Sequence, residues 1–254
     1  MTGTEEDSFR LAYVPGVTPG KWARTWAERV RDVPLVLSAM ATDEALEALR
    51  GEAVDAGLLR VPIDRSGMHA IPLYTEATVV VVPKDHEVAG VDELAIADLA
   101  GYVVLHPLDD CLGWETPPGT PANERPATTA DAIELAAAGV GLLVVPQSLA
   151  RLHHRKDLTY RPVLDAPQSS VALVWPEERT TDLMEEFIGI VRGRTANSSR
   201  GPQRQPESPQ KQKQAGNATQ NPDRQKRANA NAKTGKTSKT AKPAKTGKPR
   251  RRAR

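Results

Sequence analysis

The stretch FRLAYVPG, residues 9–16, is an apolar run closed by a proline and a glycine, so it predicts a strand followed by a turn. Thr18 and Pro19 come next, and an N-cap residue before a proline at the first helical position predicts that a helix begins there. Apolar residues then recur at every fourth position and give this helix one apolar face: Trp22, Trp26 and Val30. The chain therefore opens with a strand that feeds directly into an amphipathic helix.

The alternation of strand and helix continues beyond this unit. A second strand is predicted over 35–40, and Thr42 then has the character of a cap for a helix that ends near Gly51. A third strand is predicted over 54–61. Because helices separate these strands, we expect right-handed crossovers and a parallel sheet.

The segments that follow predict a second lobe. The run over 78–82 is the most strand-like in the chain, and we expect it to cross between the lobes. Thr128 and Asp131 have the spacing of a capping box and mark a helix start. The other expected elements are a helix near 94–99, a strand over 102–105, an irregular stretch over 107–126, a helix over 130–138, strands over 142–145 and 170–175, and a final helix capped by Thr180 that returns to the first lobe.

Charge separates the chain into two parts near residue 194. Residues 194–254 carry 18 Lys or Arg against two acids, a net charge of +16, whereas residues 1–193 carry a net charge of −14. The basic part has no aromatic residue and no aliphatic residue larger than alanine, so it has too little apolar surface to form a core. We expect a disordered tail over 194–254 and an α/β body over 1–193, with lobe I over about 8–82 and 168–192 and lobe II over about 83–167.

Lysines recur at every third position near the end of the tail, which would align them along one edge of a polyproline II strip. These lysines and the arginines after them are candidates for binding nucleic-acid phosphates: Lys233, Lys236, Lys239, Lys242, Lys245, Lys248, Arg250, Arg251, Arg252 and Arg254. DNA or RNA is thus an expected partner. Two alternatives stay open, a solubilising extension with no partner and a tail that binds its own acidic body.

Composition and motifs argue against several classes of protein. Cys111 is the single cysteine, which excludes an internal disulfide framework, and no secretory signal or run of about twenty apolar residues occurs, so we expect a cytoplasmic protein that does not span a membrane. The sequence has no nucleophile elbow, no phosphate-binding glycine loop and no Cys or His cluster at metal spacing. His153 and His154 are adjacent, so on regular structure their rings would point apart. We expect no enzyme activity, no metal and no cofactor.

Five fragments of the body share one resemblance. They are FRLAYVPG over 9–16, ALEALRG and VDAGLLR within 45–60, VVVVPKDH over 79–86, LAIADL over 94–99 and AAAGVGLLVVP over 136–146. In this order they resemble the effector-binding domain of the LysR-type transcriptional regulators, over about residues 8–192. The resemblance implies a two-lobed fold like that of type 2 periplasmic binding proteins, a small-molecule cleft between the lobes, and a homodimer paired side by side.

Two features depart from the family pattern. Family members of full length carry a winged helix-turn-helix and a linker helix before the first strand, and here that strand starts by Phe9, so we expect the effector domain without this DNA-binding head. The stretch 109–126 is punctuated by proline and glycine where family members commonly have a helix and a loop. The identity of the effector therefore does not carry over.

Strand ends and helix starts predict where a ligand would bind. In open parallel sheets, ligands lie beyond the carboxyl ends of strands, where helix N-termini carry partial positive charge. The candidate effector-binding residues are Gly16, Val17, Thr18, Thr42, Arg60, His106, Pro107 and Thr128. The resemblance implies a pocket role for the positions of Gly16, Thr42, Arg60 and Pro107. Hydroxyls, helix ends and one guanidinium suit a carboxylate or another small anion.

Each candidate also has a structural explanation. The threonines could serve only as helix caps, Arg60 could pair at the surface with Asp55 or Asp64, and His106 could be packed at a strand end. The function we expect is ligand-responsive regulation of transcription. Two other classes stay open, a stand-alone cytosolic solute-binding protein and a nucleoid-associated protein that uses the tail.

Overall fold

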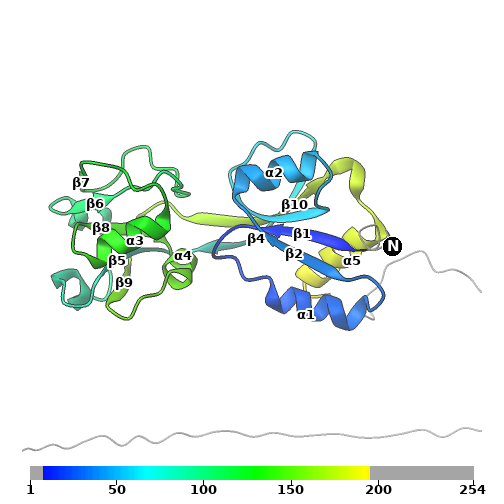
Figure 1. Cartoon of the computed structure of the whole chain (residues 1–254), viewed down its shortest axis with the longest axis horizontal. Helices are drawn as coiled ribbons and strands as arrows, with labels where there is room; N and C mark the ends of the chain where they lie inside the picture. Colours follow the sequence, from blue (N-terminus) through cyan, green and yellow to red (C-terminus); the bar gives the residue numbers. More distant parts are fainter. Residues whose placement is uncertain (1–7, 195–254) are drawn as a thin grey trace, which may run out of the picture. The chain divides into compact units, whose positions relative to one another are not determined.

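The computed structural model describes residues 8–194, which belong to one compact unit and form two lobes, each built on a five-stranded sheet (Figure 1). The expected disorder of the tail and its candidate nucleic-acid contacts, Lys233 to Arg254, lie outside the described residues. Within 8–194, no helix is long and apolar enough to cross a membrane, and no group of His, Cys, Asp and Glu side chains could hold a metal ion.

Lobe I is built on a mixed sheet with the strand order β2-β1-β3-β10-β4. Its strands are β1 (Phe9–Tyr13), β2 (Leu35–Ala39), β3 (Ala56–Val61), β4 (Met68–Glu76) and β10 (Ser169–Pro176), and its helices are α1 (Gly20–Arg29), α2 (Thr42–Arg50) and α5 (Asp182–Val191). Strand β1 runs parallel to β2 and β3, whereas β10 runs antiparallel to β3 and β4. The expected parallel sheet is therefore correct only for the first three strands, because β10 enters from lobe II in the opposite direction.

An aromatic cluster fills the core of lobe I. The ring of Phe9 on β1 lies 4.9 Å from that of Trp26 on α1 and 5.3 Å from that of Phe187 on α5, and all three side chains are buried. Each such pair contributes about 0.5–1.5 kcal/mol beyond the burial of its apolar area. The last helix thus returns to lobe I, as its apolar face predicts, and packs against the first strand and helix of the chain.

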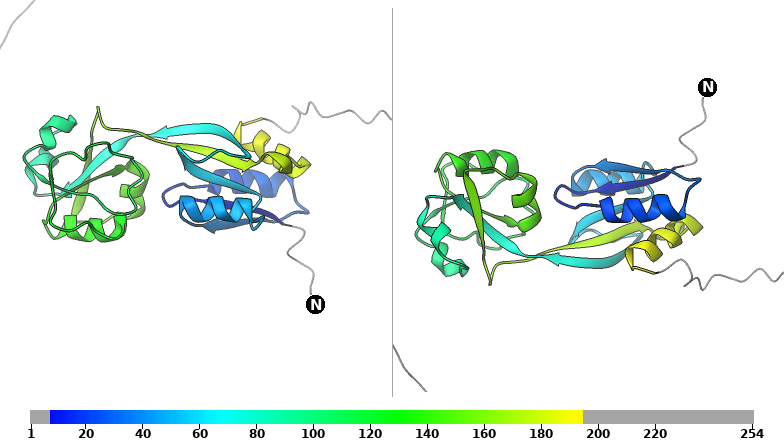
Figure 2. Two further views of the ribbon diagram at one scale, coloured as in Figure 1. Left: turned by 90° about the horizontal axis from the view of Figure 1, so that it is seen from above. Right: turned by 90° about the horizontal axis from the view of Figure 1, so that it is seen from below.

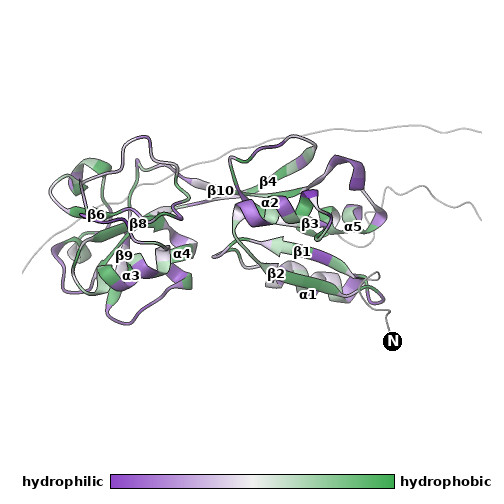
Figure 3. Ribbon diagram, turned by 45° about the horizontal axis from the view of Figure 1, so that its top comes forward, coloured by the Kyte–Doolittle hydropathy of each residue, from purple (hydrophilic) through white to green (hydrophobic). Residues whose placement is uncertain are grey.

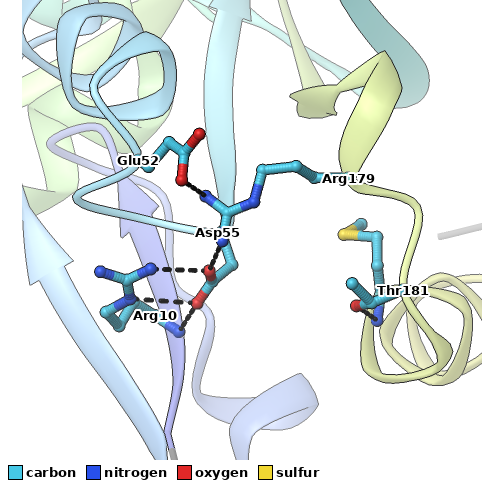
Figure 4. A network of polar contacts seen from close by, with 6 residues as sticks. Arg10, Glu52, Asp55, Arg179 and Thr181 are labelled. Carbon is cyan, nitrogen blue, oxygen red and sulfur yellow. Dashed lines mark hydrogen bonds and ion pairs between the residues drawn. The ribbon is translucent and has the colours of Figure 1, made fainter. Parts of the chain in front are cut away.

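An ion-pair network joins the short turn η3 (Glu177–Arg179) to the strands of lobe I (Figure 4). Asp55 Oδ1, just before β3, accepts from Arg10 Nη2 at 2.8 Å and from Arg179 Nη2 at 3.0 Å. Arg179 Nη1 also lies 3.8 Å from Glu52 Oε2. Because β10, η3 and α5 are consecutive, this network helps to hold the returning segment against β1 and β3.

Lobe II has a second mixed sheet, with the strand order β7-β6-β8-β5-β9. Its elements are β5 (Thr78–Pro83), η1 (Glu87–Gly90), η2 (Ile96–Leu99), β6 (Val103–Leu105), β7 (Thr120–Pro121), α3 (Thr129–Ala137), β8 (Leu142–Pro146), α4 (Gln147–Leu152) and β9 (Leu158–Pro162). Val79 and Val81 enter one apolar cluster and Val80 and Val82 another, because successive side chains of a strand point to opposite faces. Figure 3 shows hydrophobic residues along the strands of both lobes.

Two connections link the lobes, one from β4 to β5 and one from β9 to β10 (Figure 2). Strand β5 pairs with β8 and β9, so the first segment of lobe I ends at Ala77 rather than at about residue 82 as the sequence predicts. The Thr78 hydroxyl donates to the Pro167 carbonyl, which ties the two connections together. One hydrogen bond therefore joins the two connections where the lobes meet.

Most predicted strands and helices agree with the structure to within two residues at each end. The segment 94–99 contains a short 3₁₀ turn rather than a helix, and the sequence predicts none of β7, α4 and β9. The N-caps are Pro19 for α1, Ala41 for α2 and Thr181 for α5, instead of Thr18, Thr42 and Thr180. Each of these helices begins one position away from where its threonine would cap it.

The capping box predicted for α3 is confirmed. The Thr128 hydroxyl accepts from Asp131 N at 3.1 Å, and the Asp131 carboxylate accepts from Thr128 N at 3.1 Å. These two bonds satisfy donors that a helix start leaves unpaired. The start of α3 is thereby fixed at the position where lobe II meets lobe I.

Candidate effector-binding cleft

A buried ion pair between Arg60 on β3 and Glu76 at the end of β4 forms the centre of the site. The two residues are 6% and 7% exposed, and Arg60 Nε lies 3.0 Å from Glu76 Oε2. The guanidinium also donates through Nη1 to the Pro15 carbonyl at 2.8 Å and through Nη2 to Ser148 Oγ at 3.0 Å. Because Ser148 belongs to α4 in lobe II, Arg60 connects the two lobes.

The surface pairing considered for Arg60 is wrong. Asp55 and Asp64, its expected partners, pair with other arginines of lobe I. Arg60 points inward instead, where three acceptors satisfy its guanidinium. A buried charge persists only where a partner of opposite charge and further hydrogen bonds compensate its loss of water.

One cavity, which we call the cleft cavity, has a volume of about 400 Å³ and is lined from both lobes. Lobe I contributes Arg60 and the start of α2 at Thr42, and lobe II contributes the start of α3 at Thr128 and Thr129. The first N–H groups of a helix have no partner within the helix and carry partial positive charge. The structure therefore brings three of the predicted residues together at a place suited to an anion.

The sequence does not predict three further residues of the cleft cavity, Asp109, Cys111 and Thr129. Asp109 Oδ1 accepts from Thr129 Oγ1 at 2.9 Å, which joins the irregular segment after β6 to the start of α3. Burial raises the pKa of the Cys111 thiol to about 11, so the sulfur stays protonated at neutral pH. The closeness of Asp109 and Cys111 to the end of β6 is the signal that could have identified them.

A second cavity, which we call the hinge cavity, has a volume of about 840 Å³ and adjoins the connection from β4 to β5. The loop after β1 contributes Gly16, Val17 and Thr18, and the end of β4 contributes Tyr74 and Glu76. Residues of α4 in lobe II also line this cavity. The three predicted residues of the loop therefore do not line the cleft cavity.

Gly16 is constrained by its backbone and by its surroundings. Its φ of +87° lies in the left-handed region that favours glycine. A Cβ at this position would lie 2.7 Å from Ser148 Oγ and 3.0 Å from Arg60 Nη2. Glycine thus allows the β1–α1 loop to come close to the hydrogen bond that joins the lobes.

His106 and Pro107 line neither cavity. The His106 and Pro107 carbonyls accept from Arg125 Nε at 2.9 Å and from Arg125 Nη2 at 2.7 Å. His106 Nε2 lies 3.5 Å from Asp110 Oδ2. These contacts join residues within the segment that follows β6 and involve no residue of lobe I. A ligand-binding role for His106 and Pro107 stays a prediction.

The family model described as LysR substrate binding domain matches residues 3–196, about three quarters of the chain. The chain belongs to the LysR substrate-binding domain family. The resemblance carried by the five fragments is thereby confirmed.

Curated relatives of this LysR domain are named as regulators or activators rather than as enzymes. A probable hydrogen peroxide-inducible genes activator of Mycobacterium avium is 31% identical over 152 residues, which are 55% of this chain and 49% of the relative. The HTH-type transcriptional regulator CatR of Pseudomonas putida is 31% identical over 171 residues, 59% of this chain and 57% of the relative. The chain thus spans about half the length of these curated relatives.

Solved structures confirm the fold of the LysR effector domain. The BenM effector binding domain with its effector benzoate has a TM-score of 0.64 at 20% identity and covers 75% of this chain and 92% of that one. The oxidized form of OxyR has a TM-score of 0.60 at 20% identity and covers 73% and 92%. At these identities the likeness shows the fold and not the ligand.

Proposed function

We propose that the cleft cavity binds a small carboxylate effector and that binding there regulates transcription. The observation that supports this best is the convergence of two helix N-termini, those of α2 and α3, on one cavity lined from both lobes. Each N-terminus acts as roughly half a positive charge. A carboxylate held between them would contact both lobes and would favour the arrangement in which they lie close together.

The lining of the cleft cavity suits an acid of modest size, because its one carboxylate, Asp109, already accepts a hydrogen bond from Thr129 Oγ1. Glu76 neutralises much of the charge of Arg60, so the helix ends and the Thr42 hydroxyl supply most of the attraction for an anion. Leu149 and Leu152 offer apolar surface to the rest of the ligand. Benzoate, the effector described for BenM, has this composition, because it carries one carboxylate on an apolar ring.

Benzoate and benzamide form a matched pair of probes for this proposal. We expect isothermal titration to show that benzoate binds at least about tenfold more tightly, because an uncharged amide gains little from the helix ends. Thr42→Val keeps the shape of the side chain, removes the hydroxyl and should weaken benzoate binding about five- to tenfold. Thr18→Val, in the hinge cavity, is the control. Equal binding of the two probes, or an unaffected Thr42→Val variant, would contradict the proposal.

A direct response to peroxide has less support, although relatives are named as hydrogen peroxide-inducible activators. The thiolate, rather than the thiol, reacts with oxidants. With its pKa raised to about 11, Cys111 carries almost no thiolate at neutral pH. Cys111 is also the only cysteine in the sequence, so the chain offers no partner for an internal disulfide. An effector bound in the cleft cavity agrees better with these facts.

We also infer that the segment 194–254 attaches the protein to nucleic acid. Its net charge of +16 and its lack of aromatic residues favour contacts with phosphates over stacking on bases. Replacing the six periodic lysines with glutamine should reduce the slope of log affinity for duplex DNA against log salt by about five. A variant with six uncharged residues of the same segment replaced is the control.

The alternatives for this segment predict different titrations. No binding of DNA by the parent chain would favour an extension without a partner. Affinity that first rises with salt and then falls would indicate that the acidic body, with its net charge of −14, competes for the segment.

We propose that two copies of the chain pair through strand β2 of lobe I. Strand β2 is the edge strand there, and Val36 and Leu37 are 45% and 38% exposed. An edge with exposed apolar side chains is a place where another chain can add. We expect Leu37→Lys to reduce self-association in analytical ultracentrifugation, whereas Leu164→Lys, at an exposed position between β9 and β10, should leave it unchanged.

A further inference from the structure

A third cavity, which we call the arginine cavity, has a volume of about 400 Å³ and lies within lobe I. Strand β4 contributes His69 and Ile71 to its lining, the end of β10 contributes Trp175, and helix α5 contributes Ile188. It shares no lining residue with the cleft cavity or the hinge cavity. A ligand in the arginine cavity would therefore act without bridging the lobes.

Three arginines line the arginine cavity, namely Arg65 before β4 and Arg192 and Arg194 after α5. Within residues 8–194, none of their guanidinium groups makes an ion pair or a hydrogen bond. They lie on a body whose net charge over residues 1–193 is −14. Positive charges that share one cavity repel one another, so an anion bound among them would relieve that repulsion.

The end of helix α5 fixes the backbone that carries two of these arginines. Gly193 has a φ of +70°, and its N–H donates to the Ile190 carbonyl at 3.0 Å. Arg194 N donates to the Gly189 carbonyl at 2.9 Å. These two bonds form the Schellman motif, which ends a helix with a glycine in the left-handed region. Arg192 and Arg194 are thus carried by an ordered turn, which lowers the entropic cost of binding a ligand.

Other polar groups of the arginine cavity can also donate to an anion. Thr180 Oγ1 accepts from Trp175 Nε1 at 3.0 Å, which leaves the hydroxyl hydrogen of Thr180 to donate. The His69 ring lies 5.2 Å from the Trp175 ring and carries an N–H in either tautomer. Glu185 is the one carboxylate of the lining, and the three guanidinium charges exceed it by two. The cavity therefore attracts anions.

We propose that the arginine cavity binds phosphate groups of a nucleic-acid backbone. Guanidinium groups donate in a planar fork that matches the oxygens of a phosphate. Arg194 is also the first residue of the basic segment 194–254, so the site in the body continues in the sequence into that segment. This inference rests on the proposed attachment of the segment to nucleic acid, and it adds a site in the folded body.

Two simpler explanations account for less of the arginine cavity. The dipole of a helix favours cations near its C-terminus, which explains Arg192 and Arg194 but not Arg65, because Arg65 precedes β4. A single carboxylate ligand would neutralise only one of the two excess charges. A nucleic-acid backbone repeats a negative charge at every nucleotide and can neutralise both.

Amide NMR of the full chain tests the site in the body directly. Duplex DNA should shift the amides of Ala70, Ile71 and Ile188, which line the arginine cavity. Inorganic phosphate at matched ionic strength should shift the same amides, with an affinity at least about 100-fold lower, because it gains nothing from the basic segment. Succinate, whose two carboxylates are separate, should shift them less than phosphate does.

Three variants test the charges of the arginine cavity. Arg65→Gln with Arg192→Gln should reduce the slope of log affinity for duplex DNA against log salt by about two. Arg24→Gln with Arg31→Gln is the matched control and should leave the slope unchanged, because these arginines of lobe I also lack a partner within residues 8–194 but do not line the cavity. Glu185→Gln should act in the opposite direction and strengthen binding about threefold. A role confined to stability would not give opposite signs.

Three results would overturn the proposal. Unshifted amides in the arginine cavity at saturating DNA would confine binding to the segment 194–254. Equal loss of slope in the two double variants would show that any charge on lobe I suffices. Equal shifts with succinate and phosphate would assign the cavity to carboxylates, such as those of an acidic peptide. A slope that the six lysine replacements leave unchanged would instead contradict the proposal for the segment, so the two failures are distinguishable.

Discussion

The cleft cavity and the hinge cavity lie on the two sides of one ion pair, since Arg60 lines the first and Glu76 the second. They also share Pro15 and Leu152 in their walls. The starts of two helices line the cleft cavity, whereas Glu76, whose Oε1 has no hydrogen-bond partner within residues 8–194, lines the hinge cavity. Two neighbouring cavities with a common wall thus meet opposite ends of the same ion pair.

Breaking the ion pair between Arg60 and Glu76, which separates the two cavities, should have the largest effect on the free energy of unfolding. Arg60→Met leaves Glu76 buried without a cation and should lower the free energy of unfolding by about 3–5 kcal/mol, measured by urea denaturation. Replacing both partners, as Arg60→Met with Glu76→Leu, should restore much of that loss. A double variant no more stable than the single one would show that the unpaired carboxylate is not the cause.

The next largest effect should be on the reactivity of the Cys111 thiol in the cleft cavity. Because burial raises the pKa of Cys111 from 9.0 to about 11, its alkylation by iodoacetamide at pH 8 should be roughly 100-fold slower in the folded than in the unfolded protein. The folded state holds this proton more tightly, so the stability it contributes is complete below about pH 9 and is lost as the pH rises to about 11. Cys111→Ser should lack this loss. Equal alkylation rates in both states would contradict the burial argument.

A smaller effect is expected where the hinge cavity meets Arg60. Gly16→Ala places a Cβ 2.7 Å from Ser148 Oγ at a φ of +87° and should destabilise the protein by roughly 1–3 kcal/mol in thermal unfolding. Gly20→Ala is the matched control, because no atom lies within 4 Å of its Cβ and α1 begins there. That control should be neutral or slightly stabilising. If both variants melt alike, the close approach of the loop does not matter for stability.

The smallest expected difference in the free energy of unfolding is between variants of Thr128 and Thr18, two threonines that the sequence predicts as helix N-caps. Thr128→Ala removes the capping box of α3 and should lower the free energy of unfolding by about 1 kcal/mol. Thr18→Ala should change it little, because α1 has no side-chain cap. Urea denaturation of the two variants gives the comparison, and a larger loss at Thr18 would reverse it.

Periodicity and turn residues predict most of the strands and helices, because Pro and Gly end the apolar runs close to the true boundaries. They cannot predict that β10 runs antiparallel, since its direction depends on where the chain returns from lobe II. Helix α4 and strand β9 are missed because the polar stretch around His153 and His154 has the composition of a surface turn. The fold class was thus readable from local pattern, and the strand directions were not.

The site was predictable only in part for a similar reason. The rule that ligands lie at strand ends and helix starts correctly brings Thr42, Arg60 and Thr128 to one cavity. The partner of Arg60 is not predictable in this way, because Glu76 is on β4 and β10 lies between β4 and β3 in the sheet. Ser148 belongs to a helix that the sequence does not predict. Contacts that depend on tertiary neighbours far apart in the chain are the ones that local pattern leaves out.

The hydrogen bonds of Arg60 have a consequence for lobe motion. Two of its acceptors, Glu76 and Pro15, belong to lobe I, and only Ser148 belongs to lobe II. If the lobes separate, the guanidinium gives up a single bond and keeps the two that orient it. An arriving anion would then meet a side chain already in position, so capture would require little rearrangement of lobe I.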